Sequence, residues 1–183
     1  MLYMLKVIDI TLSSPLCDAV EKIYTPSFPD DERIPFERLI RSLSDTRTMT
    51  AVLDGDLLAG MFVVFLKDDL VYLAYLAVNP DIRSQGYGTA ILEIIRKKYE
   101  GKRIVIDIEQ QDSSADNSVE RKRRKEFYLR AGYKDTGVRY FFYNVHYDLL
   151  SAGGNVKASD FRSLILTHWG PIAKGAVFSK VTL

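Results

Sequence analysis

Cysteine is almost absent from this chain, and its scarcity limits what the protein can be. Cys17 is the single cysteine among 183 residues, so no intramolecular disulfide can form and nothing requires an oxidising compartment. No uncharged apolar run approaches the roughly 20 residues that span a bilayer. The apolar N-terminal stretch is interrupted by Lys6 and Asp9, which a signal peptide would lack. We therefore expect a cytoplasmic protein without a membrane partner.

An excess of charge of one sign is also missing. The chain has 25 Lys and Arg against 24 Asp and Glu, a net charge of +1, so general attraction to nucleic acid is not expected. The two histidines, His146 and His168, have no ligand-like spacing with each other or with Cys17, which predicts no metal site. Cys17 falls in a predicted apolar helix, where a buried, inert thiol is the favoured interpretation.

The hydrophobic share of 47% over 183 residues suits one domain, residues 1–183, with a substantial core. Apolar periodicity predicts strands near 3–10, 48–53, 57–66, 70–78, 104–109 and 138–149, and helices near 16–24, 36–43, 87–99 and 119–131. A last helix, capped by Ser159, reaches Trp169. The succession 70–78, 87–99, 104–109 is a βαβ unit, and the hairpins before it imply a mixed sheet in an α/β fold.

The most informative segment is the polar turn Arg83-Ser84-Gln85-Gly86-Tyr87-Gly88, which lies between an apolar strand and an amphipathic helix. A helix start presents unpaired N–H groups and about half a positive charge, so it attracts phosphate. Gly86 and Gly88 let the backbone turn tightly, and Arg83 adds a positive charge. A P-loop lysine is missing, and Ile91 stands where a dinucleotide fingerprint needs a third glycine. A different phosphate ligand is therefore indicated.

The turn matches Arg/Gln-x-x-Gly-x-Gly/Ala, and a second pattern, aromatic-Tyr-x-x-x-Gly-aromatic, follows about 40 residues later at 127–133. With these two signatures the sequence resembles the GNAT acyltransferase superfamily, best over 49–133, with a C-terminal extension at about 150–183. The resemblance implies a single GNAT-like domain with a mixed, mostly antiparallel sheet of six to seven strands flanked by helices. It also allows a homodimer.

The same resemblance implies acetyl-CoA as acyl donor and a small-molecule or peptide amine as acceptor, with direct transfer in a ternary complex. The pyrophosphate is expected on the N–H groups of 84–89, and the pantetheine arm along the preceding strand. The implied coenzyme-binding residues are Leu76, Val78, Arg83, Ser84, Gln85, Gly86, Tyr87, Gly88, Thr89 and Arg121. Arg121 stands where much of the family has an asparagine that contacts the coenzyme.

Catalysis needs an acid for the leaving thiolate and a base for the amine. Tyr128 matches the family tyrosine that protonates the coenzyme sulfur, although a core tyrosine on a helix would show the same pattern. Glu109, at the end of the strand after the phosphate-binding helix, is the candidate base, with a capping role at a solvated strand edge as the alternative. Asp107, on the same face, is the second choice. Some relatives place their base at the position of Tyr72, which cannot serve as one.

Three further points stay open at this stage. The basic run 121–125 is favoured as a solvated helix face, with coenzyme phosphate contacts or nucleic-acid binding as alternatives. The 28–33 loop lies where relatives line the acceptor site, and Glu32 there could attract a cation, while a plain helix connection held by Phe28 is equally compatible. The chain as a whole could instead be an acyl-CoA sensor or scaffold without turnover, or a phosphate-binding domain unrelated to coenzyme A.

Overall fold

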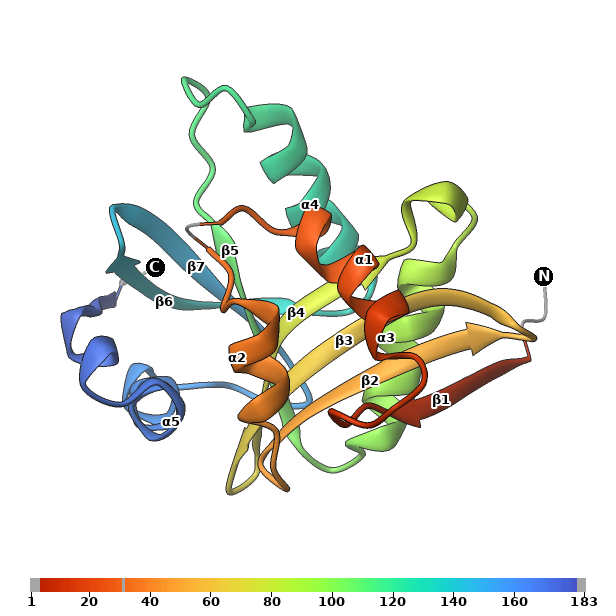
Figure 1. The fold of residues 1–183 in the computed structure, drawn as a ribbon. Coiled ribbons are helices and arrows are strands. Elements are labelled where there is room, and N and C mark those ends of the chain that lie inside the picture. The colour runs from red at the N-terminus through yellow and green to blue at the C-terminus, as the bar shows by residue number, and fades with distance from the viewer. Residues whose placement is uncertain (1–3, 31, 181–183) are drawn as a thin grey trace. The chain divides into compact units, whose positions relative to one another are not determined.

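The structure, a computed structural model, describes residues 4–30 and 32–180, which contain both strands and helices (Figure 1). The strands are β1 (Leu5–Asp9), β2 (Arg47–Asp54), β3 (Leu57–Lys67), β4 (Leu70–Val78), β5 (Arg103–Glu109), β6 (Lys134–Phe142), β7 (Val145–Ala152) and β8 (Val177–Lys180). The α-helices are α1 (Cys17–Ser27), α2 (Phe36–Arg41), α3 (Tyr87–Lys98), α4 (Ser118–Arg130) and α5 (Ala158–Trp169). Two 3₁₀ helices join them, η1 (Pro80–Ile82) and η2 (Gly170–Gly175). Tyr3, Asp31 and 181–183, which belong to predicted segments, lie outside the described residues.

The strands form one mixed sheet in the order β1-β2-β3-β4-β5-β7-β6-β8. The pairs β1–β2, β2–β3, β5–β7, β6–β7 and β6–β8 are antiparallel, whereas β4–β5 is parallel. This confirms the predicted α/β class and the mixed, mostly antiparallel sheet. The predicted strand count of six to seven is too low for the described residues, which contain eight.

The extra strands come from two places. The segment 138–149, predicted as one strand, is the hairpin β6–β7, in which Tyr143 (φ 46°) and Asn144 (φ 61°) make the turn. Two successive positive φ values suit the twist of a two-residue hairpin, and asparagine tolerates that conformation. The continuous aromatic character of the segment concealed the turn. The strand β8, inside the C-terminal extension, was not predicted.

Two helix ends also differ from the predicted ones. Ser159 is not the cap of α5, because Lys157 occupies the N-cap position and Ala158 begins the helix. The helix predicted at 16–24 ends later than expected, because α1 runs to Ser27 with Pro26 in its last turn. Proline removes one backbone donor and crowds the carbonyl four residues earlier. In the last turn that cost is small, and the hydroxyl of Ser27 bonds the Ile23 carbonyl at 2.7 Å.

The chain divides into two compact units, whose boundaries fall inside β3 and β4 and at the end of α3. Unit 1 comprises Met1–Phe65 and Leu73–Lys98, and unit 2 comprises Leu66–Tyr72 and Tyr99–Leu183. Because β3 and β4 contribute residues to both, the division does not by itself separate two domains. The single-domain organisation therefore stays a prediction.

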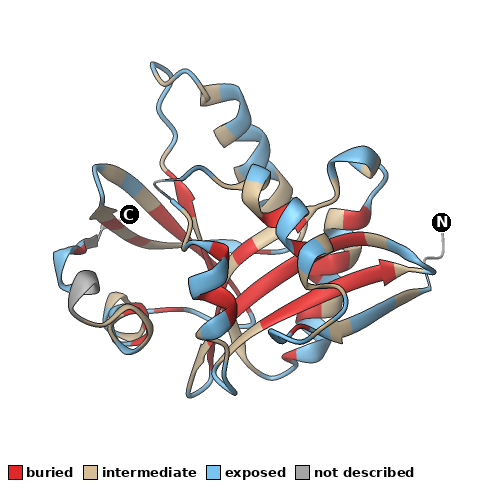
Figure 2. Cartoon of the chain, in the orientation of Figure 1, coloured by how far each residue is buried: buried red, intermediate tan, exposed pale blue. Residues whose placement is uncertain are grey.

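In unit 1, α1 and α2 lie on one face of the strands and α3 lies on the other (Figure 1). The strands between them are buried through most of their length (Figure 2). The close approach of α3 to the sheet depends on Gly60 in β3. A Cβ there would lie 2.5 Å from the Ala77 carbonyl oxygen and 2.8 Å from Cδ1 of Ile91. The glycine thus lets the helix that follows the predicted phosphate turn pack directly on β3 and β4.

In unit 2, α5 packs through Phe161 against an aromatic cluster that rises from β4, β6 and β8. The Phe161 ring centroid lies 5.1 Å from that of Tyr72 and 5.6 Å from that of Tyr140. Tyr140 stacks in turn with Tyr147 at 4.9 Å and with Phe178 at 5.3 Å. Phe161 itself is fully buried. The predicted C-terminal extension therefore forms part of the core of this unit.

Candidate active site

The predicted phosphate turn is built by two left-handed residues ahead of α3. Ser84 has φ 65° and Gly86 has φ 91°, and the helix begins at once, with the amide of Ala90 bonded to the Gly86 carbonyl at 3.1 Å. Asn79 supports the approach to the turn, because its side chain donates to the Leu58 carbonyl at 2.9 Å and accepts from the Asp81 amide. The first amide N–H groups of α3 therefore point out of the N-terminal end of the helix, as anion binding requires.

The turn is exposed, apart from one anchoring side chain. Exposed residues are Arg83, Ser84, Gln85, Gly86 and Thr89, and Gly88 is partly exposed. Tyr87 is buried, and its hydroxyl donates to Oδ2 of Asp54 at 2.8 Å. Its predicted contribution to coenzyme binding is thus limited to the backbone amide, whereas the side chain ties α3 to β2.

The end of β4 leads into this turn. Leu76 and Val78 are partly exposed, while Tyr75 and Ala77, on the other face, are buried. The ladder between β4 and β5 spans only Leu70–Tyr72, opposite Arg103–Val105. Within the described residues the rest of β4 has no ladder partner in β5.

The candidate base Glu109 is enclosed by cations. It is buried, and its carboxylate lies 2.7 Å from a guanidinium nitrogen of Arg121 and 3.5 Å from one of Arg124. The amide nitrogen of Asn117 reaches both carboxylate oxygens, at 3.4 and 3.3 Å. Glu109 therefore ties α4 to β5, and it does not sit at a solvated strand edge as the alternative interpretation held.

The basic run 121–125 is partly tied down in the same way. Besides its bond to Glu109, Arg121 donates to Oδ1 of Asn117 at 2.6 Å and to the Gln110 carbonyl at 3.0 Å. Lys125 pairs with Asp148 at 3.1 Å. Arg121, Arg124 and Lys125 thus link α4 to the rest of unit 2, while the solvated-face interpretation fits Lys122, Arg123 and Arg124, which are exposed. Arg121 would have to exchange these partners to contact a coenzyme phosphate.

The second-choice base, Asp107, has a different environment. Its Oδ1 accepts the hydroxyl of Tyr72 at 2.8 Å, and its Oδ2 accepts the hydroxyl of Tyr140. Burial raises the pKa of Asp107, and the two tyrosine hydrogen bonds oppose that rise. As a whole residue it keeps partial exposure. Asp107 is therefore a desolvated carboxylate with neutral hydrogen-bond donors.

The candidate acid, Tyr128, lies on α4 and is partly exposed. Its ring contacts those of Phe127 and Tyr133, with centroids 5.1 and 5.6 Å away. Burial raises the pKa of its phenol to about 12, and Arg124 opposes this while the carboxylate of Asp107 adds to it. The phenol is thus protonated at neutral pH and close enough to Asp107 to sense its charge. Tyr128 is thus partly exposed as a residue while its phenol is desolvated, and both interpretations of it keep support.

The 28–33 loop is anchored from β4. The Tyr75 hydroxyl accepts the Ile34 amide at 3.0 Å and donates to the Glu32 carbonyl at 3.3 Å. The ring of Phe28 lies 4.9 Å from that of Tyr75 and 5.3 Å from that of Tyr24. Glu32 itself is exposed. Both interpretations of the loop thus keep support: Phe28 holds the connection, and Glu32 can meet a cation.

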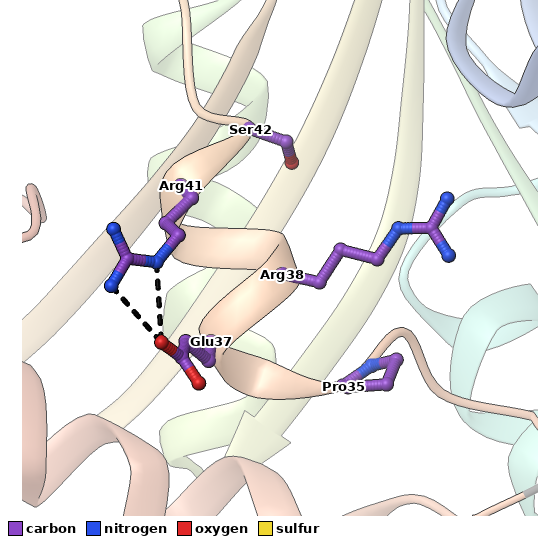
Figure 3. Close-up of a pocket in the computed structure, with 5 residues that line it drawn as sticks. All are labelled: Pro35, Glu37, Arg38, Arg41 and Ser42. Atoms are coloured by element: carbon purple, nitrogen blue, oxygen red, sulfur yellow. Dashed lines mark hydrogen bonds and ion pairs between the residues drawn. The ribbon is translucent and has the colours of Figure 1, made fainter.

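A shallow depression of about 470 Å³ lies over α2, lined by Pro35, Glu37, Arg38, Arg41 and Ser42 (Figure 3). Glu37 pairs with Arg41 at 3.0 Å, while Arg38 extends away from that pair. None of the predicted site residues lines it, so it offers no support for the predicted chemistry.

The cysteine and the two histidines considered from the sequence lie at ordinary positions in the helices and strands. Cys17 begins α1 and is only partly buried, contrary to the prediction of full burial. His168 lies in the last turn of α5, with its ring hydrogen-bonded to the Leu66 carbonyl at 3.0 Å, and the His146 ring packs on Phe141. Among residues 4–30 and 32–180 no three His, Cys, Asp or Glu side chains converge as metal ligands. No helix of that same part is long and apolar enough to cross a membrane.

The predicted site residues therefore form two groups. The turn 83–89 follows directly on Leu76 and Val78 in unit 1, and Asp107, Glu109, Arg121 and Tyr128 gather in unit 2.

A family model described as the acetyltransferase (GNAT) domain matches residues 44–135, half of the chain, and includes both signatures. The chain belongs to the GNAT acetyltransferase family.

Solved structures share the fold of this GNAT protein. A GNAT-family protein from Bacteroides thetaiotaomicron is 23% identical, with a TM-score of 0.71 over 90% of this chain and 98% of its own. The Escherichia coli ribosomal-protein-S18-alanine N-acetyltransferase is 15% identical, with a TM-score of 0.60 over 86% and 98%. A GNAT acetyltransferase from Elizabethkingia anophelis with acetyl-CoA bound is 16% identical, with a TM-score of 0.56 over 80% and 96%. A search of the curated proteins finds no match.

Sequence reasoning missed the role of Tyr140. The residue was seen only as part of an aromatic strand, and β6 is not a sheet neighbour of β5. Its hydroxyl reaches Asp107 across β7, a contact that no spacing in the sequence announces. Tyr72 was noted for its position, but its hydrogen bond to Asp107 was not predicted.

Proposed function

We propose that this GNAT protein is an acetyl-CoA-dependent N-acetyltransferase that acetylates a primary amine by direct transfer in a ternary complex. The observation that carries the proposal is the exposed left-handed turn 83–86 in front of α3, inside the region matched by the family. The acetyl-CoA bound to the Elizabethkingia relative supports the choice of donor.

Donor binding follows from the chain's own groups. The amides of 84–89 and the guanidinium of Arg83 offer a positive end to the pyrophosphate. The pantetheine arm is proposed to run along Leu76 and Val78, which lie beyond the end of the β4–β5 ladder. Backbone amides of that strand can donate to the carbonyl oxygen as negative charge develops on it.

Transfer then needs two proton movements. A carboxylate on β5, Glu109 or Asp107, takes one proton from the substrate ammonium, and the freed nitrogen lone pair attacks the thioester carbonyl. As the C–S bond breaks, the Tyr128 hydroxyl donates its proton to the sulfur, and the nitrogen releases its second proton. The phenolate regains a proton, so that the products are the amide, the thiol and one proton released to solvent. Tyr128 suits this role because it is protonated at neutral pH.

Heat stability with and without acetyl-CoA tests donor binding. Saturating coenzyme should raise the melting temperature of the wild type, because it binds only the folded state. The Gly86→Trp variant should show no rise, since a side chain at φ 91° in the turn blocks the amides. Gly101→Trp is the matched control, because Gly101 has φ 79°, lies just beyond the other end of α3 and has open space around it. It should keep the wild-type response.

Turnover is tested on a panel of amines by release of the coenzyme thiol. Thiol release with at least one amine, lost in Tyr128→Phe while the thermal response to acetyl-CoA persists, supports catalysis. Coenzyme binding without thiol release over the whole panel would favour a sensor or scaffold. Stabilisation by nucleotides instead of acetyl-CoA would identify an unrelated phosphate-binding domain.

A further inference from the structure

Two tyrosines hold the carboxylate of Asp107 from opposite sides. Tyr72, on the neighbouring strand β4, donates to Oδ1 at 2.8 Å, and Tyr140, two strands away on β6, donates to Oδ2. An ionised carboxylate offers about four lone-pair sites, so one donor on each oxygen leaves room for a further proton. The carboxylate is therefore fixed in orientation and still able to accept.

Neither tyrosine can itself touch a substrate. Tyr72 is 3% exposed and Tyr140 is 2% exposed, and Phe161 of α5 covers both rings. Tyr140 is further confined by the stacked rings of Tyr147 and Phe178. Rings packed on this many sides keep their hydroxyl groups in place, so the two tyrosines hold Asp107 without entering the chemistry.

Glu109 and Asp107 differ in what proton uptake would cost. Protonating Glu109 would break its ion pairs with Arg121 and Arg124. Asp107 has no cation within ion-pair distance among the described residues, and its hydrogen bonds come from neutral phenols. It also lies close enough to Tyr128, the candidate acid, to interact with it electrostatically. These contacts favour Asp107 as the group that exchanges a proton and Glu109 as the group that holds α4.

We propose that Asp107 takes the proton from the acceptor ammonium and that Tyr72 and Tyr140 are positioning residues that fix its carboxylate. The inference rests on the proposed function. An N–H bond of the ammonium breaks, its electron pair stays on nitrogen, and the proton passes to a carboxylate oxygen of Asp107 and then to solvent. The neutral amine then attacks the thioester.

The direction of the pH effect follows from the groups around Asp107. Burial raises its pKa, while the hydrogen bonds from Tyr140 and Tyr72 and the charge of Arg124 lower it. Tyr128 on α4 interacts with Asp107 electrostatically, and the residue paired with Asp107 on β7, Leu149, is apolar. Removing either phenol leaves the ionised carboxylate less stabilised. The pKa of Asp107 should therefore rise by roughly one unit for each hydroxyl removed.

The test measures this pKa directly in the full chain by carbon NMR of labelled aspartate carboxyl groups, with the Asp107 signal assigned by its loss in Asp107→Asn. The variants Tyr72→Phe and Tyr140→Phe keep the rings and remove one oxygen each. Tyr143→Phe is the matched control, since Tyr143 is 66% exposed at the tip of the β6–β7 hairpin. We expect the midpoint to rise in the first two variants and to stay unchanged in the control.

The acid limb of kcat/KM against pH should move upward by the same amount in the same two variants. An unchanged NMR midpoint would overturn the positioning role. A midpoint that rises while the acid limb stays in place would overturn Asp107 as base. If no amine is turned over by the wild type, the proposed function fails, and Asp107 loses its role as base with it. The NMR result still decides independently whether the tyrosines hold the carboxylate.

Discussion

At the residue scale, desolvation determines the acidity of the Tyr128 phenol. Burial raises the pKa of its phenol to about 12, so the proton needed by the leaving thiolate is present throughout the neutral and mildly alkaline range. The same shift makes transfer of this proton to a thiolate with a pKa of about 8.5 unfavourable by itself, so the phenolate has to regain a proton for the transfer to be complete. The phenol therefore acts by donating to the sulfur as negative charge develops there.

The first prediction concerns the alkaline behaviour of this residue. The Tyr128→Phe variant should lower kcat by about 10²- to 10⁴-fold while leaving the thermal response to acetyl-CoA in place. In the wild type, ionisation of Tyr128 should cause no loss of kcat up to about pH 10, because its pKa lies near 12. The measurements are kcat against pH and the phenolate absorbance of both proteins. A phenolate signal near pH 9 that is present only in the wild type would contradict the expectation.

The second prediction concerns Gly60, where the absence of a side chain sets the position of a helix. The Gly60→Ala variant should lose about 1–3 kcal/mol of unfolding free energy, because its Cβ would lie 2.5 Å from the Ala77 carbonyl oxygen. Urea denaturation measures the change. Gly175→Ala is the control, with its nearest heavy atom at 3.9 Å, and should change stability by less than about 0.5 kcal/mol. Equal stability of the two variants would show that α3 can move away at no cost.

At the scale of elements, α4 depends on ion pairs for its place. No residue of the helix is fully buried, its N-cap Asn117 makes no capping bond, and its charged side chains meet Glu109 and Asp148 instead. A helix with an apolar face would be held by packing, and this one lacks such a face. Since α4 carries Tyr128, its anchoring bears on the predicted chemistry.

The third prediction tests that anchoring. The Glu109→Gln variant leaves Arg121 without its carboxylate in a pair whose side chains are 8% and 18% exposed, so it should cost about 1–3 kcal/mol and speed amide hydrogen exchange in α4. Glu126→Gln is the control on the same helix. Its pair with Arg130 is exposed, at 49% and 70%, and should contribute little. Unchanged exchange in Glu109→Gln would remove the anchoring role.

The elements themselves were largely predictable. The run 70–78 and the helix after the glycine turn were located within a residue, because apolar runs and stripes report burial directly. The β6–β7 turn was not, since Tyr143 and Asn144 sit inside an aromatic run and their positive φ values depend on the pairing of the two strands. The strand β8 was missed because four residues show too little periodicity.

At the scale of the whole molecule, the two units share β3 and β4, and the question is whether they unfold together. Trp169 is the only tryptophan in the chain and lies in unit 2, so its fluorescence follows that unit, whereas far-ultraviolet circular dichroism follows all helices and strands. Fluorescence can therefore report whether a mutation in unit 1 also changes the stability of unit 2.

The fourth prediction is that unfolding is a single transition. In urea the two probes should coincide, and Gly60→Ala, a change in unit 1, should move the Trp169 midpoint as far as the dichroism midpoint. The physical reason is that a break at the unit boundary would have to pass through two continuous strands. A dichroism change that precedes the fluorescence change in the variant would instead reveal two independently stable domains.

The sequence alone determined the class of the fold, the family and the position of the glycine turn ahead of α3 in this GNAT protein, because each depends on local pattern. The succession of a strand, then Arg83, Gly86 and Gly88, then a helix is a local pattern that predicts a tight turn at the start of the helix. Only the tertiary structure decided which of the two carboxylates has no cation within ion-pair distance among the described residues. Asp107 and Glu109 are equivalent in the alternation of β5, and they differ because α4 brings Arg121 to one while β4 and β6 bring phenols to the other. Those partners are distant in sequence, so pairing of strands and packing of a helix had to place them.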